Sequence, residues 1–163
     1  MHNIKIGGNN MKEFFNIEDC NELFKKVSCF GNNNCIFFTY RVSDGKKTGL
    51  MAGIEYGKDN YDALLINANE YGIGFIPLKN DGILTFLKPD NMIIIIEKFS
   101  FYNYDNIRSI SVKNFSFLNK KTKKIKIVIN DGKEFNLVAH LSEKILPYHE
   151  NNFRMFINKY ENK

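Results

Sequence analysis

Residue types that bind metals or act as nucleophiles are few in this chain and widely spaced. They are three histidines and three cysteines: His2, His140, His149, Cys20, Cys29 and Cys35. The histidines lack the spacing of a metal-ligand set, and the cysteines, nine and six residues apart, fit neither a zinc CxxC pair nor a disulfide framework. We therefore expect no metal site, no cofactor and reduced thiols, as in a cytoplasmic protein.

The sequence also lacks a catalytic signature. Catalysis needs a nucleophile or paired carboxylates with an orienting partner, whereas the acidic residues are scattered along the chain. Cys35 precedes a run of apolar residues, where a thiol usually packs as a small hydrophobic side chain. His149 and Glu150, at the start of a predicted helix, are interpreted as a hydrated first turn rather than a catalytic pair. The sequence leaves enzymatic activity open but favours a non-enzymatic protein.

The most pronounced charge feature is the stretch KKTKKIKIVINDGKEF, residues 120–135. The chain has a net charge of +5, and residues 113–133 alone contain seven lysines and one aspartate. Clustered lysines attract phosphate groups, so this stretch is a candidate anion-binding site. The candidate residues are Lys120, Lys121, Lys123, Lys124 and Lys126. The other interpretation is that these lysines only form the hydrated face of a hairpin.

A second candidate site is the aromatic series FSFYNYD, residues 99–105. Side chains alternate between the two faces of a strand, so Phe99 and Phe101 would face the core while Tyr102 and Tyr104 would point outward. Exposed tyrosines offer a large contact area at small entropic cost. Tyr102 and Tyr104 are therefore candidate contacts for a protein partner, the alternative being a half-buried place at the rim of the fold.

Strands would position these side chains. From residue 35 onward, strand-like alternation is interrupted by turn signals every 8 to 15 residues, a pattern typical of an antiparallel sandwich or barrel. The predicted strands are 35–42, 49–56, 62–68, 71–78, 92–101, 107–114, 123–130 and 134–140. Gly72 and Gly74 lie inside one of them and are expected to allow a close backbone approach or a bend.

The register of the last predicted hairpin follows from its apolar residues. A two-residue turn would place polar residues opposite the isoleucines. A three-residue loop, Asn130 to Gly132 with Gly132 left-handed, instead pairs Ile127 with Phe135 and Ile125 with Leu137. This second register places Lys124 and Lys126 on the outer face.

Two helices are predicted outside the β-rich region. Residues 17–27 follow Asn16, a good helix N-cap, and their apolar face is expected to cover part of the sheet. Residues 148–160 carry aromatic residues at helical spacing and are expected to cap one end of the barrel. Residues 1–10 are expected to form a disordered arm, and residues 11–163 a single domain with its barrel at about 35–141.

The segment MIIIIE, residues 92–97, is apolar on both faces of its predicted strand. An exposed strand of this kind risks aggregation, so either the 17–27 helix or a second copy of the chain should cover it. Homodimerisation is therefore one hypothesis. The longest purely apolar run, Met92 to Ile96, is far shorter than a membrane span, and we expect no transmembrane segment.

Three stretches resemble the pleckstrin-homology-like (PH-like) superfold, in particular bacterial PH-like domains. They are LLINANEYGIGFIPL (64–78), FYNYDNIRSISVKN (101–114) and KKIKIVINDGKEFNLVA (123–139). The resemblance implies a mainly β fold, with about seven strands in an antiparallel barrel or two orthogonal sheets and a C-terminal capping helix. It also implies a binding or scaffolding module. Eukaryotic relatives bind phosphoinositides around the loop between their first two strands, near which Arg41, Lys46 and Lys47 would lie, but the flanking strands lack the further basic residues that such binding uses.

Two functions are consistent with these observations. The first is a non-enzymatic module that binds another protein, or itself, through strand edges and exposed aromatic residues. The second is binding of anionic surfaces, lipid head groups or nucleic acid, through the Lys120 to Lys126 end. Nucleic acid is the less expected partner because the chain has only three arginines to interleave with aromatic residues.

Overall fold

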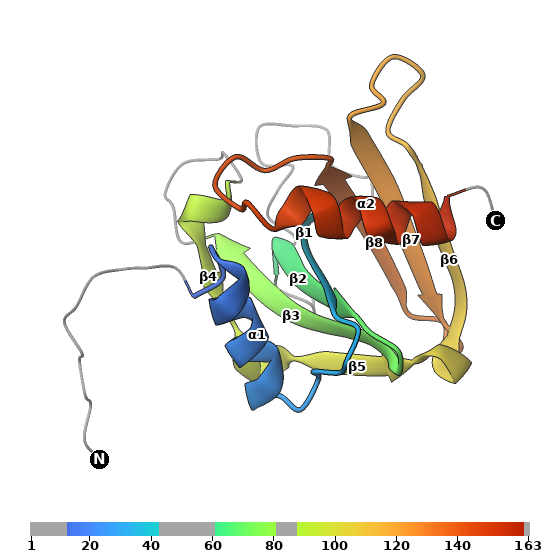
Figure 1. The fold of residues 1–163 in the computed structure, drawn as a ribbon. Coiled ribbons are helices and arrows are strands. Elements are labelled where there is room, and N and C mark those ends of the chain that lie inside the picture. The colour runs from blue at the N-terminus through green and yellow to red at the C-terminus, as the bar shows by residue number, and fades with distance from the viewer. Residues whose placement is uncertain (1–12, 43–60, 81–87, 162–163) are drawn as a thin grey trace.

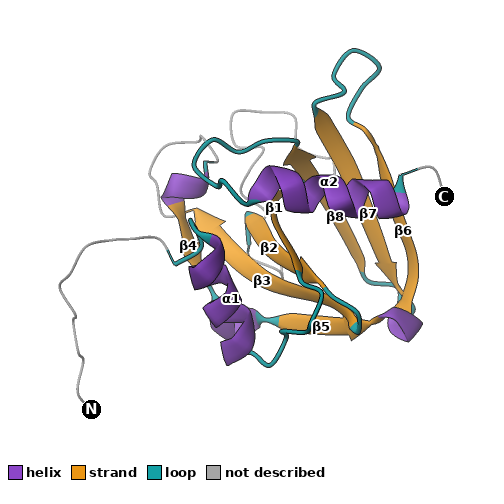
Figure 2. Ribbon diagram, viewed as in Figure 1, coloured by secondary structure: helices purple, strands orange, loops and turns teal. Residues whose placement is uncertain are grey.

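The computed structural model describes residues 13–42, 61–80 and 88–161. Within these residues, an antiparallel sheet of eight strands is flanked by two α-helices (Figure 1, Figure 2). The strands are β1 (Cys35–Arg41), β2 (Ala63–Ala68), β3 (Gly72–Asn80), β4 (Met92–Ile94), β5 (Ser100–Asn103), β6 (Ile107–Asn114), β7 (Thr122–Ile129) and β8 (Glu134–His140). The helices are α1 (Ile17–Lys26) and α2 (His149–Tyr160), with 3-10 turns η1 (Pro89–Asn91), η2 (Ile96–Lys98) and η3 (Tyr104–Asn106). The predicted mainly β fold is confirmed.

The sheet does not close into a barrel, so the barrel predicted over residues 35–141 is wrong. The strand order is β4-β3-β2-β1-β8-β7-β6, with β5 also paired to β3. Closure would require β6 to pair with β4 or β5 at the other end of this order. Instead, the 3-10 turn η3 separates β5 from β6 in the chain, and these two strands do not pair. The described strands therefore form one open sheet.

Six predicted strands agree with the structure to within two residues: β1, β2, β3, β6, β7 and β8. The strand predicted at 49–56 lies outside the described residues, as do the predicted arm at 1–10 and Lys46 and Lys47. The single strand predicted at 92–101 is wrong, because β4 and β5 are separate. Five residues, 95–99, face only two residues of β3, Ile76 and Pro77, and the surplus is looped out around η2. Pro77 has no N–H to hold a continuous ladder there.

The β7–β8 hairpin has the predicted register. Ile127 pairs with Phe135 and Ile125 pairs with Leu137. Gly132 has a φ of 96°, and its N–H donates to the Ile129 carbonyl oxygen at 3.0 Å. Only glycine adopts this left-handed conformation without a steric cost from Cβ. The three-residue loop, rather than a two-residue turn, therefore sets which lysines of β7 face outward.

Two apolar clusters lie on opposite faces of β1, β2 and β3. Neighbouring residues of β1 point into different clusters: Phe37 into one, Ile36 and Phe38 into the other. α1 supplies Leu23 and Phe24 to the cluster around Phe38, which we call the α1 cluster. Because both faces of these strands are covered, they read as nearly continuous apolar segments rather than as clean alternations.

The N-terminal helix forms as predicted and covers part of the sheet. The Asn16 side chain accepts the Asp19 N–H at 2.8 Å, which caps the first turn of α1. In the MIIIIE segment, Met92 is buried in the α1 cluster, and Ile94 and Ile96 pack against it. α1 is therefore one cover for this segment. Self-association through the exposed side chain of Ile93 stays a prediction.

The C-terminal helix packs on the cluster around Phe37, which we call the α2 cluster. It also completes the backbone hydrogen bonding of β1. The rings of Phe153 and Phe156 lie 5.2 and 4.7 Å from the ring of Phe37. β1 pairs with β8 only at Tyr40 and Arg41, and α2 provides partners farther along the strand. Asn152 Nδ2 donates to the Ile36 carbonyl oxygen at 2.8 Å. The predicted capping helix thus exists, but it covers an open sheet instead of a barrel end.

Neither helix in the described part of the chain is long and apolar enough to cross a membrane.

Candidate functional site: the basic end of the β6–β7 hairpin

The β6–β7 hairpin ends in a seven-residue loop, residues 115–121, that projects from the rest of the molecule (Figure 1, Figure 2). Its base is closed by the Phe115 N–H, which donates to the Thr122 carbonyl oxygen at 2.8 Å. Inside the loop, the Asn119 N–H donates to the Ser116 carbonyl oxygen at 3.3 Å and lies 3.1 Å from the Ser116 hydroxyl oxygen. These bonds shape the loop, although its side chains do not pack into the core.

Four of the five predicted anion-binding lysines are exposed: Lys120, Lys121, Lys124 and Lys126. Lys123 is the exception, since it is only 8% exposed. Its Nζ donates to Glu161 Oε1 at 2.6 Å and to Asn114 Oδ1 at 2.7 Å. The assignment of Lys123 to the anion-binding set is therefore corrected: its charge is already neutralised inside the fold. Lys123 shares the inward face of Ile125 and Ile127 on β7, and its carboxylate partner lies 38 residues later in the sequence.

The remaining lysines of β7 differ in how free their charges are. Lys126 Nζ lies 3.0 Å from Glu134 Oε2, so its charge is partly neutralised. The Lys124 ammonium lies 5.0 Å from the centre of the Phe115 ring, a cation–π contact that leaves its charge uncompensated. Lys124 also pairs across the hairpin with Lys113. Lys113 was missed as a site residue because only the β6–β7 register places it beside Lys124.

Four lysines surround the base and side of the loop, and we call them the tip lysines: Lys113, Lys120, Lys121 and Lys124. All four are exposed, and among the described residues no carboxylate lies within ion-pair distance of them. Like charges directly opposite one another on a sheet are destabilising, so the Lys113–Lys124 pair costs folding energy. The arrangement concentrates positive charge and can bind an anionic partner.

The end of the loop is apolar. Phe117 is 90% exposed and Leu118 is 92% exposed, and the neighbouring Phe115 is also exposed. Single exposed apolar residues are common on protein surfaces, but two adjacent ones almost free of contacts at the end of a hairpin are not. Sequence reasoning overlooked this pair. The available signal was FSFL, an apolar stretch where a polar turn is expected between two strands.

The two candidate tyrosines do not project from the surface as the alternation predicted. Tyr102 is half-buried, with its ring centre 5.9 Å from that of Phe135 and 6.0 Å from that of Phe75. Tyr104 is also half-buried, and its hydroxyl donates to the Asn69 carbonyl oxygen at 2.7 Å. Phe101, assigned to the core, is exposed.

The pairing of β5 with β3 explains this reversal of faces. Tyr102 pairs with Ile73, which is buried in the α2 cluster, so the two side chains share the core face. Phe101 pairs with Gly74 and lies beside Gly72 on the other face, where it is 40% exposed. Gly72 allows the close backbone approach predicted from the sequence, since a Cβ there would lie 2.7 Å from the Cα of Asn103. A Cβ on Gly74 would instead meet side chains, those of Cys29 and Phe99.

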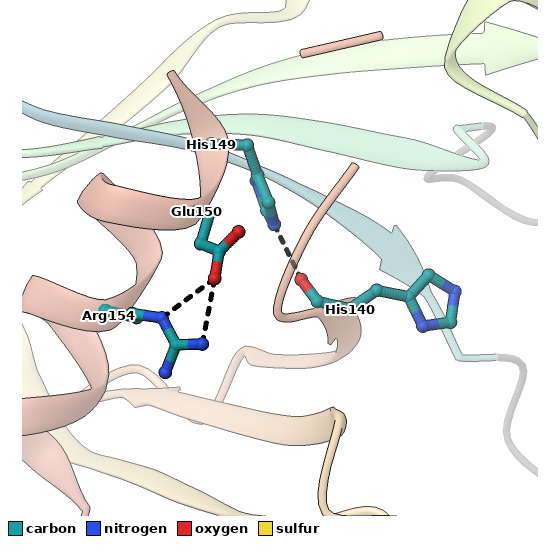
Figure 3. Close-up of polar contacts among 4 residues, drawn as sticks. All are labelled: His140, His149, Glu150 and Arg154. Atoms are coloured by element: carbon teal, nitrogen blue, oxygen red, sulfur yellow. Dashed lines mark hydrogen bonds and ion pairs between the residues drawn. The ribbon is translucent and has the colours of Figure 1, made fainter. Parts of the chain in front are cut away.

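His149 is fully buried at the start of α2, so its interpretation as a hydrated first turn is wrong. Its Nδ1 accepts the Phe38 N–H at 3.1 Å, and its Nε2 lies 2.7 Å from the His140 carbonyl oxygen (Figure 3). This pattern requires the neutral tautomer that carries its proton on Nε2. Burial lowers the pKa of His149 to about 4. Glu150 instead pairs with Arg154 at 2.8 Å along the helix (Figure 3).

The three cysteines are poor nucleophiles in this fold. Burial raises the pKa of Cys20 to about 12 and that of Cys29 and Cys35 to about 11, which disfavours the nucleophilic thiolate. Cys35 donates its S–H to the Asn152 carbonyl oxygen at 3.0 Å. Within the described ranges, no three His, Cys, Asp or Glu side chains are placed to hold a metal ion.

The chain matches no protein-family model, no curated protein and no solved structure. The basic hairpin end is therefore the main candidate site.

Proposed function

We propose that the protein is a non-enzymatic, PH-like binding module that attaches to anionic surfaces through the end of the β6–β7 hairpin. The observation that carries the proposal is the set of four exposed tip lysines, which have no carboxylate partner among the described residues. An antiparallel sheet with a C-terminal helix packed on one face supports the PH-like part. In this proposal the phosphate groups of the partner supply the missing negative charge.

The contrast between lysines of the same strand supports an external partner. Lys123 and Lys126 each have a carboxylate partner within 3.0 Å. Lys124, which lies between them on β7, faces Lys113 of β6 instead. A protein that only needed a hydrated hairpin face would gain stability from an acidic residue at one of these positions. Keeping two lysines there is favourable if an anionic partner binds them.

Salt dependence tests the proposal directly. Each lysine near an anionic surface contributes about 1 kcal/mol, so replacing all four tip lysines by glutamine should abolish binding to anionic vesicles. The affinity of the unmodified protein should fall steeply as salt rises, since bound lysines displace counterions. Because the tip lysines are exposed, the melting temperature should not fall, and loss of the Lys113–Lys124 repulsion should raise it slightly.

A matched control carries the same change in net charge elsewhere. It replaces four other exposed lysines by glutamine: Lys26, Lys79, Lys98 and Lys144. This control should retain most of the affinity, because its lysines are not gathered at the hairpin end. Equal losses in the two variants would mean that binding follows net charge alone, and the proposal would fail.

Protein–protein contact is a second candidate function, favoured by Phe101. This side chain is 40% exposed on β5, which pairs with β3 alone among the described strands. The half-buried positions of Tyr102 and Tyr104 make Phe101 the better aromatic contact on this edge. If the edge mediates self-association, Phe101→Ser should reduce the oligomer mass in light scattering. A monomer at every concentration would exclude self-association.

A further inference from the structure

We propose that the tip of the β6–β7 loop inserts into the interfacial region of an anionic lipid bilayer. Phe117 and Leu118 enter the boundary between head groups and acyl chains, and the tip lysines contact the lipid phosphates. This inference rests on the proposed function and selects a lipid bilayer among the anionic surfaces that the lysines could bind.

The placement of the two apolar side chains carries the inference. Phe117 and Leu118 occupy the end of a projecting hairpin, and each has about nine tenths of its surface in water. No other large apolar residue among those described is more than two thirds exposed. Moving two such side chains out of water is favourable by about 1.5–3 kcal/mol each when burial is complete. In the free protein both side chains stay in water, so this burial free energy is not gained.

The lysines lie at the depth that lipid head groups require. Lys120 follows Leu118 by two residues, which is at most about 7 Å along an extended chain. Apolar side chains of interfacial proteins enter the head-group and acyl boundary by about 5–10 Å. When the tip enters to this depth, Lys120 and Lys121 reach the phosphates, and Lys113 and Lys124 lie behind them at the hairpin base.

Chemistry favours lipid over nucleic acid and over protein as the partner. Leu118 has no ring to stack on a base, so half of the apolar tip would gain little from a nucleic acid strand. A protein pocket could accept the two apolar side chains, but the surrounding lysines would then each need an acidic partner. An anionic bilayer supplies both components at once, acyl chains for the tip and phosphates for the lysines.

A single tryptophan can report insertion, because the chain contains none. The Phe117→Trp variant is mixed with vesicles of phosphatidylcholine, with or without phosphatidylglycerol. We expect its emission to shift to shorter wavelength, and to be quenched by acyl-brominated lipid, only when phosphatidylglycerol is present. The control is Tyr71→Trp, at the exposed turn between β2 and β3, which should show neither change. An unchanged Phe117→Trp spectrum on vesicle-bound protein would overturn the inference.

A second variant separates this inference from the proposed function. Phe117→Ser/Leu118→Ser should lower partitioning onto phosphatidylglycerol vesicles at least about tenfold. Its melting temperature should not change. If it binds as well as the unmodified protein while the tip-lysine variant loses binding, charge alone mediates attachment: the inference fails and the proposed function stands. If the unmodified protein sediments with no anionic vesicle and binds no oligonucleotide at low salt, both fail. Binding to an oligonucleotide alone would also reject insertion.

Discussion

The imidazole of His149 accepts the backbone N–H of Phe38 at its Nδ1 atom, 3.1 Å away, across 111 residues of sequence. In an open sheet, β1 would otherwise have an unpaired donor where β8 no longer runs beside it. A buried N–H without a partner costs about 1–3 kcal/mol. A side chain of α2 therefore takes the place of a neighbouring strand, and the C-terminal helix is part of the sheet's hydrogen bonding as well as of its core.

Protonation of His149 should destabilise the fold at mildly acidic pH. Its pKa is about 4 in the folded protein, below the usual 6.5, because burial disfavours the charged ring. The unfolded chain therefore binds the proton first, and the stabilisation present above about pH 6.5 is lost as pH falls toward 4. Between pH 7 and pH 5 the loss should be about 2 kcal/mol in urea unfolding.

The His149→Gln variant provides the control for this pH dependence. Glutamine does not titrate, so the difference in free energy of unfolding between the two proteins should shrink as pH falls from 7 to 5. Carboxylates that titrate near pH 4 affect both proteins alike. Parallel pH profiles for the two proteins would show that His149 is not the titrating group.

A second prediction concerns Lys123, a buried lysine of β7 that contacts the C-terminal end of α2. Lys123 Nζ lies 2.6 Å from Glu161 Oε1, and the Glu161 side chain is 30% exposed. Glu161→Gln should lower the free energy of unfolding by about 1–3 kcal/mol, because it leaves the Lys123 ammonium with neutral amide acceptors and no opposite charge. Urea denaturation measures this loss.

The control for Glu161 is the exposed pair on α2. Glu150→Gln breaks an ion pair with Arg154 in which both side chains are about half exposed, and it should cost less than about 0.5 kcal/mol. Lys123→Met should also cost less than Glu161→Gln, because the remaining carboxylate can be hydrated. Similar losses for Glu161→Gln and Glu150→Gln would contradict a buried charge at Lys123.

Removal of the C-terminal helix should unfold the described fold. Deleting residues 148–163 exposes Phe37 and removes Phe153 and Phe156, each worth roughly 1.5–3 kcal/mol of burial. It also removes His149 and Asn152, the partners of β1. Near-ultraviolet circular dichroism should lose its signal. A truncated chain that still melts cooperatively would contradict this role of α2.

Sequence patterns predicted those parts of the fold that depend on interactions between residues close in the sequence. The capping side chain at Asn16, the left-handed Gly132 and the alternation of isoleucines in β7 each depend on neighbours within a few residues. The open sheet could not be predicted in this way, because it depends on β5 and β6 failing to meet after η3. The faces of Tyr102 and Phe101 depend likewise on a partner strand, β3.

The candidate site was predicted only in part, because it too depends on residues that are distant in the sequence. The clustering of lysines is a property of the sequence, and four of the five candidates are exposed. Lys123 was misassigned because its partner, Glu161, lies 38 residues away at the end of α2. Lys113 was missed because it approaches Lys124 only through the hairpin register. Charge density is visible in a sequence, whereas neutralisation by a distant carboxylate is not.

Gly72 should be the least tolerant glycine of the described sheet. A Cβ at this position would collide with the Tyr102 carbonyl oxygen and would lie 2.7 Å from the Asn103 Cα, and both obstacles are backbone. Gly72→Ala should therefore push β5 away from β3 and cost about 1–3 kcal/mol or more. Because β3 is the one described strand that pairs with β5, amide hydrogen exchange should accelerate in residues 100–103 while β7 and β8 stay protected.

Gly132→Ala is the comparison, since a Cβ at Gly132 would have no atom within 4 Å and only the positive φ opposes the change. It should cost about 1–2 kcal/mol, with any faster exchange confined to the β7–β8 loop. A Gly72→Ala protein with unchanged exchange at Phe101 and Tyr102 would mean that β5 stays paired with β3 despite the added Cβ. The close backbone approach at Gly72 would then not restrict this position to glycine.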